Sequence, residues 1–205
     1  QAGGLVAQPL AYARGTVPEA VAFRRRGVME RREFNEEHIP LAYFISFRCY
    51  GTWLHGDARG SVDLIHNSYG TAFLPRDEQR EYEEFQRLKH SPIQLDERRR
   101  PIVEKTVQEV CQHRGWLLRA INVRTNHVHT VVVADCKPEK VMDAFKAYAT
   151  RRMGEAGVWK SGEKPWSRHG STRWLWTERS VDCAIDYVLN CQGDDLPNFE
   201  DWEKD

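Results

Sequence analysis

The sequence lacks the features that mark several common protein classes. Its 205 residues include five cysteines, an odd number, and no CxxC pair. This pattern argues against a disulfide framework and against a zinc ribbon. No apolar stretch approaches the ~20 residues of a membrane span, and residues 1–28 lack the basic-then-apolar order of a signal peptide. We therefore expect a cytoplasmic protein.

The sequence also lacks a net charge. Thirty lysines and arginines balance thirty aspartates and glutamates, which argues against a uniformly basic coat, although a neutral total can hide a local basic face. Seven tryptophans and seven tyrosines stand among short arginine clusters. Aromatic rings beside arginines can stack unpaired bases, but we expect at least half of the tryptophans to fill the core.

The length and the order of the elements predict one α+β domain. Strand patterns cover about 41–50, 116–123, 127–135 and 172–177, and helix patterns cover about 75–90, 95–114, 138–153 and 180–192, the last capped by Ser180. A small antiparallel sheet with helices packed on it satisfies this order. We expect residues 1–37 to be a poorly ordered extension, 38–193 a single domain with an insert at about 57–95, and 194–205 an acidic tail.

Two histidines lie two residues apart in the third strand pattern, His127 and His129. A strand directs residues i and i+2 to the same face, so both imidazoles point the same way. Two neutral imidazoles make two thirds of a divalent-metal site. The simpler alternative is a hydrogen-bonded polar pair on a solvated face. Nucleotide transfer through a His-x-His-x-His motif is excluded, because the third position is Val131.

The last helix pattern carries Tyr187 beside an apolar stripe rather than within it. The stripe comprises Val181, Ala184, Ile185, Val188 and Leu189. A tyrosine at the edge of a buried face can present its hydroxyl to a neighbouring surface. The alternative is a packing tyrosine with a solvated hydroxyl.

The motif Asn-His-Val-His (126–129), followed 58 residues after His129 by the helical motif Tyr-Val-Leu-x-x-Gln (187–192), resembles the single-tyrosine HUH transposases. These are the IS200/IS605-like enzymes and the REP-associated tyrosine transposases. The resemblance covers about residues 40–193. It implies a ferredoxin-like palm, with the two histidines on a central strand and the nucleophile on a C-terminal helix.

The resemblance implies metal-dependent cleavage and strand transfer of single-stranded, hairpin-forming DNA. His127 and His129 would hold Mg²⁺ or Mn²⁺, which stabilises the leaving oxygen. Attack by Tyr187 would give a covalent phosphotyrosine and a free 3′ hydroxyl. This intermediate stores the bond energy, so rejoining needs no ATP, and the sequence has no P-loop. Such an enzyme would work on the nucleoid, as a monomer or a homodimer.

The third metal ligand departs from the family pattern. The resemblance leads us to expect Gln or Asn four residues after the tyrosine, where this chain has Cys191. Gln192 comes one residue later, about 140° around an ideal helix from Tyr187. A widened last turn before Gly193 would bring Gln192 round, and a thiolate suits Mg²⁺ poorly. We therefore predict Gln192 as the third ligand.

Residues beside the two motifs are candidates for DNA contacts. Arg124 and Asn126 precede the histidines, and Lys146, Arg151 and Arg152 surround Tyr148 in the preceding helix pattern. We rank Tyr148 below Tyr187 as a nucleophile, because the family places its tyrosine in the later helix. The main alternative is a non-catalytic or domesticated nucleic-acid-binding module of the same fold. A protein-interaction module whose histidines bind no metal is a further one.

Overall fold

The computed structural model of the protein describes residues 40–61, 74–160 and 162–193. The predicted extension 1–37, part of the predicted insert and the predicted tail 194–205 lie outside these residues. In the described part of the chain, no helix has the length and apolar composition needed to cross a bilayer.

A four-stranded antiparallel sheet forms the centre of the described residues. Its strands are β1 (Ala42–Cys49), β2 (Leu117–Val123), β3 (His127–Val133) and β4 (Trp166–Leu175), in the spatial order β2-β3-β1-β4. With one helical connection after β1 and another after β3, this is the ferredoxin-like arrangement. The predicted α+β class is confirmed, and the strand with both histidines is central.

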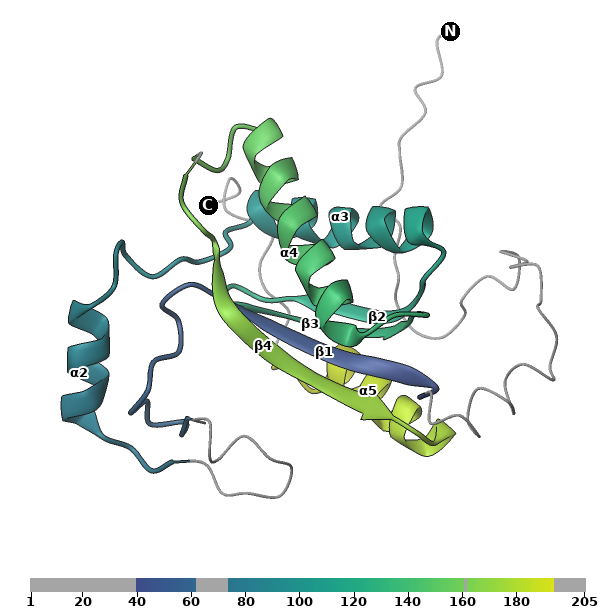
Figure 1. Cartoon of the computed structure of the whole chain (residues 1–205), viewed down its shortest axis with the longest axis horizontal. Coiled ribbons are helices and arrows are strands. Elements are labelled where there is room, and N and C mark those ends of the chain that lie inside the picture. Colours follow the sequence, from purple (N-terminus) through teal and green to yellow (C-terminus); the bar gives the residue numbers. More distant parts are fainter. Residues whose placement is uncertain (1–39, 62–73, 161, 194–205) are drawn as a thin grey trace, which may run out of the picture.

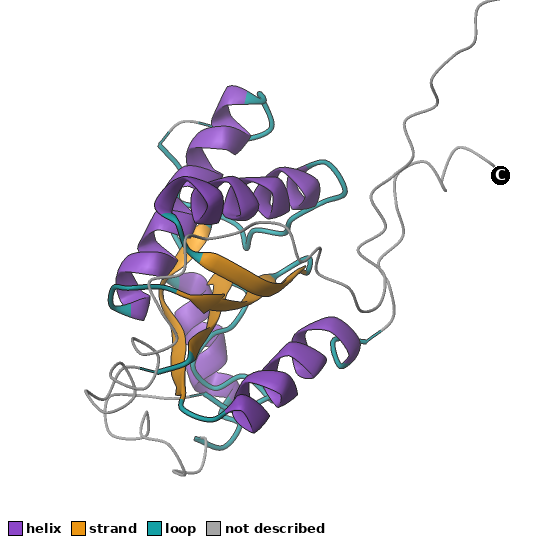
Figure 2. Cartoon of the chain, turned by 90° about the vertical axis from the view of Figure 1, so that its right-hand side faces the viewer, coloured by secondary structure: helices purple, strands orange, loops and turns teal. Residues whose placement is uncertain are grey.

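Helices cover both faces of the sheet. They are α2 (Glu78–Gln86), α3 (Arg99–Arg114), α4 (Pro138–Glu155) and α5 (Glu178–Asn190). Figure 1 shows α3 and α4 over one face of the sheet and α5 under the other, and Figure 2 shows the same layers from the side. The helix α2 stands apart from these layers (Figure 1).

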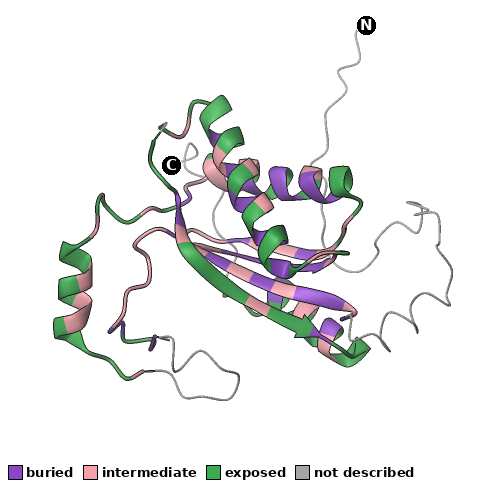
Figure 3. Cartoon of the chain, in the orientation of Figure 1, coloured by how far each residue is buried: buried purple, intermediate pink, exposed green. Residues whose placement is uncertain are grey.

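Alternate residues of the central strands build two separate cores. Ile45 and Phe47 of β1 and Val128 of β3 join the larger core under α3 and α4. Val131 of β3 belongs to a smaller core that includes Val188 of α5. Figure 3 shows this alternation along β1 and an outer strand, β4, that is mostly exposed. The period-two pattern thus separates the two faces.

Helix ends agree with the sequence at one position and correct it at another. Gly115 ends α3 in the left-handed region, with φ of 71°, as its place after the helix pattern suggests. Thr177, not Ser180, caps α5. The Thr177 hydroxyl accepts from the Ser180 backbone N–H, and the Ser180 hydroxyl accepts from that of Thr177. Ser180 therefore completes a reciprocal capping box three residues inside.

The fourth strand begins earlier than predicted. The predicted strand covers about 172–177, whereas β4 extends from Trp166 to Leu175. The cause is its edge position, because most of its side chains are exposed and no apolar alternation marks it. Gly170 allows close approach to β1: a Cβ there would lie 2.5 Å from the Ser46 carbonyl oxygen.

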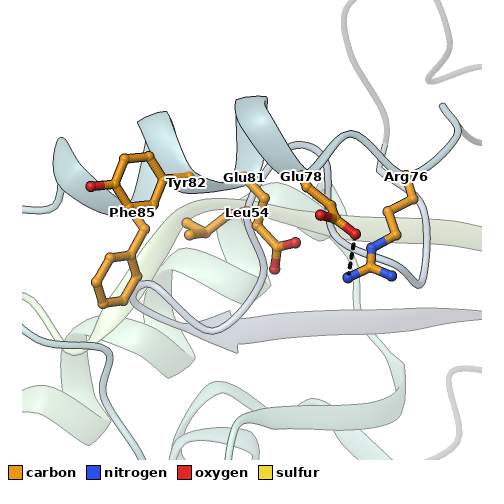
Figure 4. A pocket seen from close by; sticks show the side chains of 6 residues that line it. All are labelled: Leu54, Arg76, Glu78, Glu81, Tyr82 and Phe85. Carbon is orange, nitrogen blue, oxygen red and sulfur yellow. Dashed lines mark ion pairs between the residues drawn. The ribbon is translucent and has the colours of Figure 1, made fainter.

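The predicted insert contains α2 and a shallow pocket beside it. The Asp77 side chain caps α2 by accepting from the Arg80 backbone N–H. Figure 4 shows the pocket, with the ion pair of Arg76 and Glu78 at one end and the exposed rings of Tyr82 and Phe85 at the other. None of the predicted site residues lines this pocket.

Candidate functional site

The two histidines lie side by side on the face of β3 that α5 covers. Their ring centroids are 4.6 Å apart. The Ser46 hydroxyl lies 2.5 Å from Nδ1 of His129, and Nδ1 of His127 donates to the Asn126 side-chain oxygen at 2.6 Å. Because both Nδ1 atoms are engaged and orient their rings, the Nε2 atoms are the ones left to bind a ligand.

Burial keeps both imidazoles neutral. Removal from solvent lowers the pKa of His127, and nearby arginines lower it further; the Gln192 amide oxygen opposes this, because it can accept from the charged ring. Burial, followed by the charges of His127 and Arg48, lowers the pKa of His129 to about 3. A neutral imidazole is the form that binds metal ions.

Tyr187 packs its ring against the histidine pair from α5. Its ring centroid is 5.7 Å from that of His129 and 5.9 Å from that of Phe44, edge-on in both cases. The residue is nevertheless 44% exposed. Tyr148, the lower-ranked candidate, lies in the other layer, where Arg151 stacks on its ring. The structure therefore brings Tyr187, and not Tyr148, to the histidines.

Gln192 reaches the histidines just beyond the end of α5. The helix ends at Asn190, and Cys191 forms its C-cap. The Gln192 amide nitrogen donates to the Tyr187 carbonyl at 3.1 Å, which directs the amide oxygen to within 3.3 Å of His127 Nε2. The irregular chain after the helix, rather than helical periodicity, places Gln192 there.

The donor set of this cluster fits a divalent cation. Because His127 Nδ1 donates to the Asn126 oxygen, Nε2 carries a lone pair, and it faces the amide oxygen of Gln192, also an acceptor. Two acceptors that face each other at 3.3 Å need a cation or a proton between them. Among the described residues no three His, Cys, Asp or Glu side chains gather around one point, and the Gln192 amide oxygen is the acceptor that lies beside His127.

The other predicted DNA contacts fall into two groups. Asn126 belongs to the histidine cluster through His127, and the charge of Arg124 contributes to the lowered pKa of His127. Lys146, Arg151 and Arg152 lie on α4, in the opposite layer.

The three α4 residues have local partners. Lys146 is buried and donates to the carbonyls of Ser167 and His169 at 3.0 and 3.2 Å. Arg152 pairs with Glu109 and Glu155. The structure does not bring these residues to the histidines, and their phosphate contacts stay a prediction that the proposals below do not use.

Arg48 is a site residue that the sequence reasoning missed. Its Cα is the cross-strand partner of the Cα of His127, and it points to the same face as Ser46. Its guanidinium carbon lies 3.2 Å from the centre of the Trp53 ring. The signal was available: Ser46 and Arg48 are polar at alternate positions of an otherwise apolar and aromatic strand.

A comparison with known protein families finds a match to part of the chain. Residues 87–178 match the family model described as "Transposase IS200 like". The matched segment contains α3, β2, β3, α4 and β4, with both histidines, and it ends at the first residue of α5, before Tyr187. No curated protein matches the sequence.

Two solved structures are similar at low identity. One is a REP-associated tyrosine transposase bound to a REP hairpin, with 11% identity and a TM-score of 0.38 over 72% of this chain and 63% of that one. The other is a putative transposase from Deinococcus radiodurans R1, with 14% identity and a TM-score of 0.38 over 74% and 90%. This chain thus spans less than two thirds of the REP-associated protein.

Proposed function

We propose that this chain cleaves and rejoins single-stranded DNA through a covalent bond between Tyr187 and a 5′ phosphate. The match of residues 87–178 to the IS200-like transposase model supports this proposal. The observation that carries this proposal is that Tyr187 of α5 and Gln192, just beyond the end of α5, both lie against the histidine pair of β3. Hairpin-forming DNA is the substrate that the family suggests.

Tyr187 is the nucleophile. Its hydroxyl oxygen bonds to phosphorus as the bond from phosphorus to the 3′ oxygen breaks; the phenol proton passes to solvent, and the 3′ oxygen takes up a proton. Rejoining is the reverse, with a 3′ hydroxyl attacking the phosphotyrosine. The exposed part of the Tyr187 side chain gives a DNA strand access to this position.

His127, His129 and Gln192 are the residues that would hold the metal ion. Bound Mg²⁺ or Mn²⁺ would polarise the scissile phosphate and stabilise the departing oxygen. Ser46 and Asn126 fix the two rings through their Nδ1 atoms, as the outer hydrogen bonds of metal-binding histidines do. Gln192 also ties the site to the nucleophile, because its amide donates to the backbone of Tyr187.

Denaturing gel electrophoresis tests this function. The full chain is incubated with labelled single-stranded hairpins from the flanks of its own gene, with Mg²⁺ or Mn²⁺ and with EDTA. We expect a metal-dependent protein–DNA adduct that is lost in Tyr187→Phe and kept in Tyr148→Phe. An adduct lost only in Tyr148→Phe would show that the nucleophile is Tyr148 on α4 and not Tyr187 on α5. Binding in a native gel with no adduct in any lane would indicate a non-catalytic module.

A further inference from the structure

Trp53 and two arginines, Arg48 and Arg59, pack together next to the histidine pair. The guanidinium carbons of Arg48 and Arg59 lie 3.2 and 4.6 Å from the centre of the Trp53 ring. The Trp53 indole donates to the Gly60 carbonyl at 2.7 Å. Cation–π contacts at such distances hold a guanidinium in one orientation.

The two arginines differ in whether hydrogen bonds and an ion pair neutralise the guanidinium charge. Arg59 pairs with Asp57 through its Nε and Nη2 atoms and donates to the Thr52 carbonyl at 3.0 Å. Arg48 is half-buried, yet no hydrogen bond or ion pair joins its guanidinium to any residue in the described ranges. Arg48 is thus a partly desolvated cation whose N–H donors are uncommitted.

Such a cation calls for an anion. Burial, with the repulsion of Arg59, lowers the pKa of Arg48 to about 10, against opposing effects of Asp57 and Tyr187. The guanidinium therefore stays charged at neutral pH. A partly buried charge without a hydrogen bond or ion pair is costly, and a planar fork of N–H donors matches the oxygens of a phosphate.

The position of Arg48 indicates where a bound phosphate would lie on the protein. It is the cross-strand neighbour of His127, and Ser46, two residues earlier on the same face, contacts His129. The charge of Arg48 contributes to the lowered pKa values of both histidines. An anion on Arg48 would therefore lie beside the histidine pair and on the α5 side of the sheet.

We propose that Arg48 binds a backbone phosphate of the single-stranded DNA beside His127 and His129, and that Trp53 holds the guanidinium in place. This inference rests on the proposed function and adds a substrate-binding residue to it. Arg59 is neutralised by Asp57, and it positions the Trp53 ring rather than contacting the DNA.

Fluorescence anisotropy of a labelled single-stranded hairpin, titrated with the full chain in EDTA, tests this step without cleavage. Arg48→Gln keeps a stem to pack on Trp53 and removes the charge. We expect its Kd to rise about tenfold and the slope of log Kd against log salt to fall by ~0.7, the contribution of one single-strand phosphate contact. Trp53→Leu keeps the charge, so we expect a smaller loss of affinity with an unchanged slope.

The matched control is Arg114→Ala. Arg114 also stacks on a tryptophan, with its guanidinium carbon 5.9 Å from the Trp116 ring centre, but it lies at the end of α3 in the opposite layer. We expect it to bind DNA as the unmodified chain does. Wild-type affinity and slope in Arg48→Gln would overturn the inference, as would equal losses in Arg114→Ala.

Circular dichroism melting identifies any variant that fails to fold. If Arg48→Gln does not fold, Arg48→Lys takes its place, because lysine keeps the charge but not the planar fork of donors. Weaker DNA binding by Arg48→Lys at an unchanged salt slope supports the inference, and unchanged affinity overturns it.

The two proposals fail separately. If the unmodified chain forms no adduct but Arg48→Gln weakens DNA binding and lowers the salt slope, the phosphate contact is supported and the proposed cleavage through Tyr187 is wrong. If the adduct forms while Arg48→Gln binds the hairpin DNA normally, the proposed cleavage is supported and Arg48 only packs on Trp53.

Discussion

The two faces of the sheet use the same two strands for different purposes. On the side of α3 and α4, Phe47 of β1 and Val128 of β3 are fully buried among apolar side chains. On the side of α5, the adjacent residues Ser46, Arg48 and His129 are polar, and Ser46 lies opposite His129 and contacts it. One residue of displacement along a strand therefore separates the core from the candidate chemistry, because the side-chain period is two.

Burial shifts pKa values on both faces, in opposite directions. On the α3 and α4 side it raises the pKa of the Cys49 and Cys111 thiols to about 12. On the α5 side it lowers the pKa of His129 to about 3. In each case the neutral form is favoured. The result is an unreactive thiol on the first face and, on the second, a neutral imidazole, which is the form that can bind a metal ion.

The largest expected effect separates the faces by stability. Phe47→Ala should lower the free energy of unfolding by about 3–5 kcal/mol, because it opens a cavity in the larger core. Phe44→Ala, on the α5 face, removes a half-buried ring and should cost less, while adduct formation falls because the ring that contacts Tyr187 is lost. Urea denaturation and the adduct assay check the pair. Equal destabilisation with normal adduct would show that the faces do not differ in this way.

Metal binding should stabilise the protein through the α5 face alone. At 100 times its dissociation constant, Mn²⁺ should add about 2.7 kcal/mol to the free energy of unfolding. A thermal melt should show this as a rise in Tm that disappears in His129→Ala and persists in Tyr148→Phe. A rise that survives in His129→Ala would place the metal elsewhere. No rise in the unmodified chain would favour a histidine pair that binds no metal.

The end of α5 allows a finer comparison between neighbours. Gln192→Ala should weaken Mn²⁺ binding by about tenfold, since it removes an oxygen donor from the cluster. Cys191→Ala should leave it unchanged, because the thiol is exposed and suits this ion poorly. Isothermal titration calorimetry measures both. The reverse order of effects would assign the third ligand to Cys191.

The smallest effect concerns thiol labelling at neutral pH. Cys183 and Cys191 are exposed, whereas Cys49 and Cys111 are buried with raised pKa values. We expect a maleimide to label the first two within minutes and the other two only after unfolding. Mass spectrometry of the labelled peptides reads the order. Early labelling of Cys49 would mean that the α3 and α4 face opens in the native state.

The sequence by itself determined the elements whose signals are local. Strand alternation predicted a common face for His127 and His129, and the position of Tyr187 beside the apolar stripe left its ring free to meet a neighbour. The glycine after α3 predicted its end. Weak local signals failed: the edge strand β4 has no buried face to impose alternation, and Ser180 resembles a cap although Thr177 fills that position.

The tertiary structure alone decided which elements meet. Periodicity shows that a helix has an apolar side, but not which face of the sheet it covers, so only the topology separates Tyr187 on α5 from Lys146 and Tyr148 on α4. Gln192 lies off the Tyr187 side of an ideal helix and reaches His127 because α5 ends at Asn190. Arg48 and His127 are 79 positions apart in the sequence and become neighbours only through the β1–β3 register.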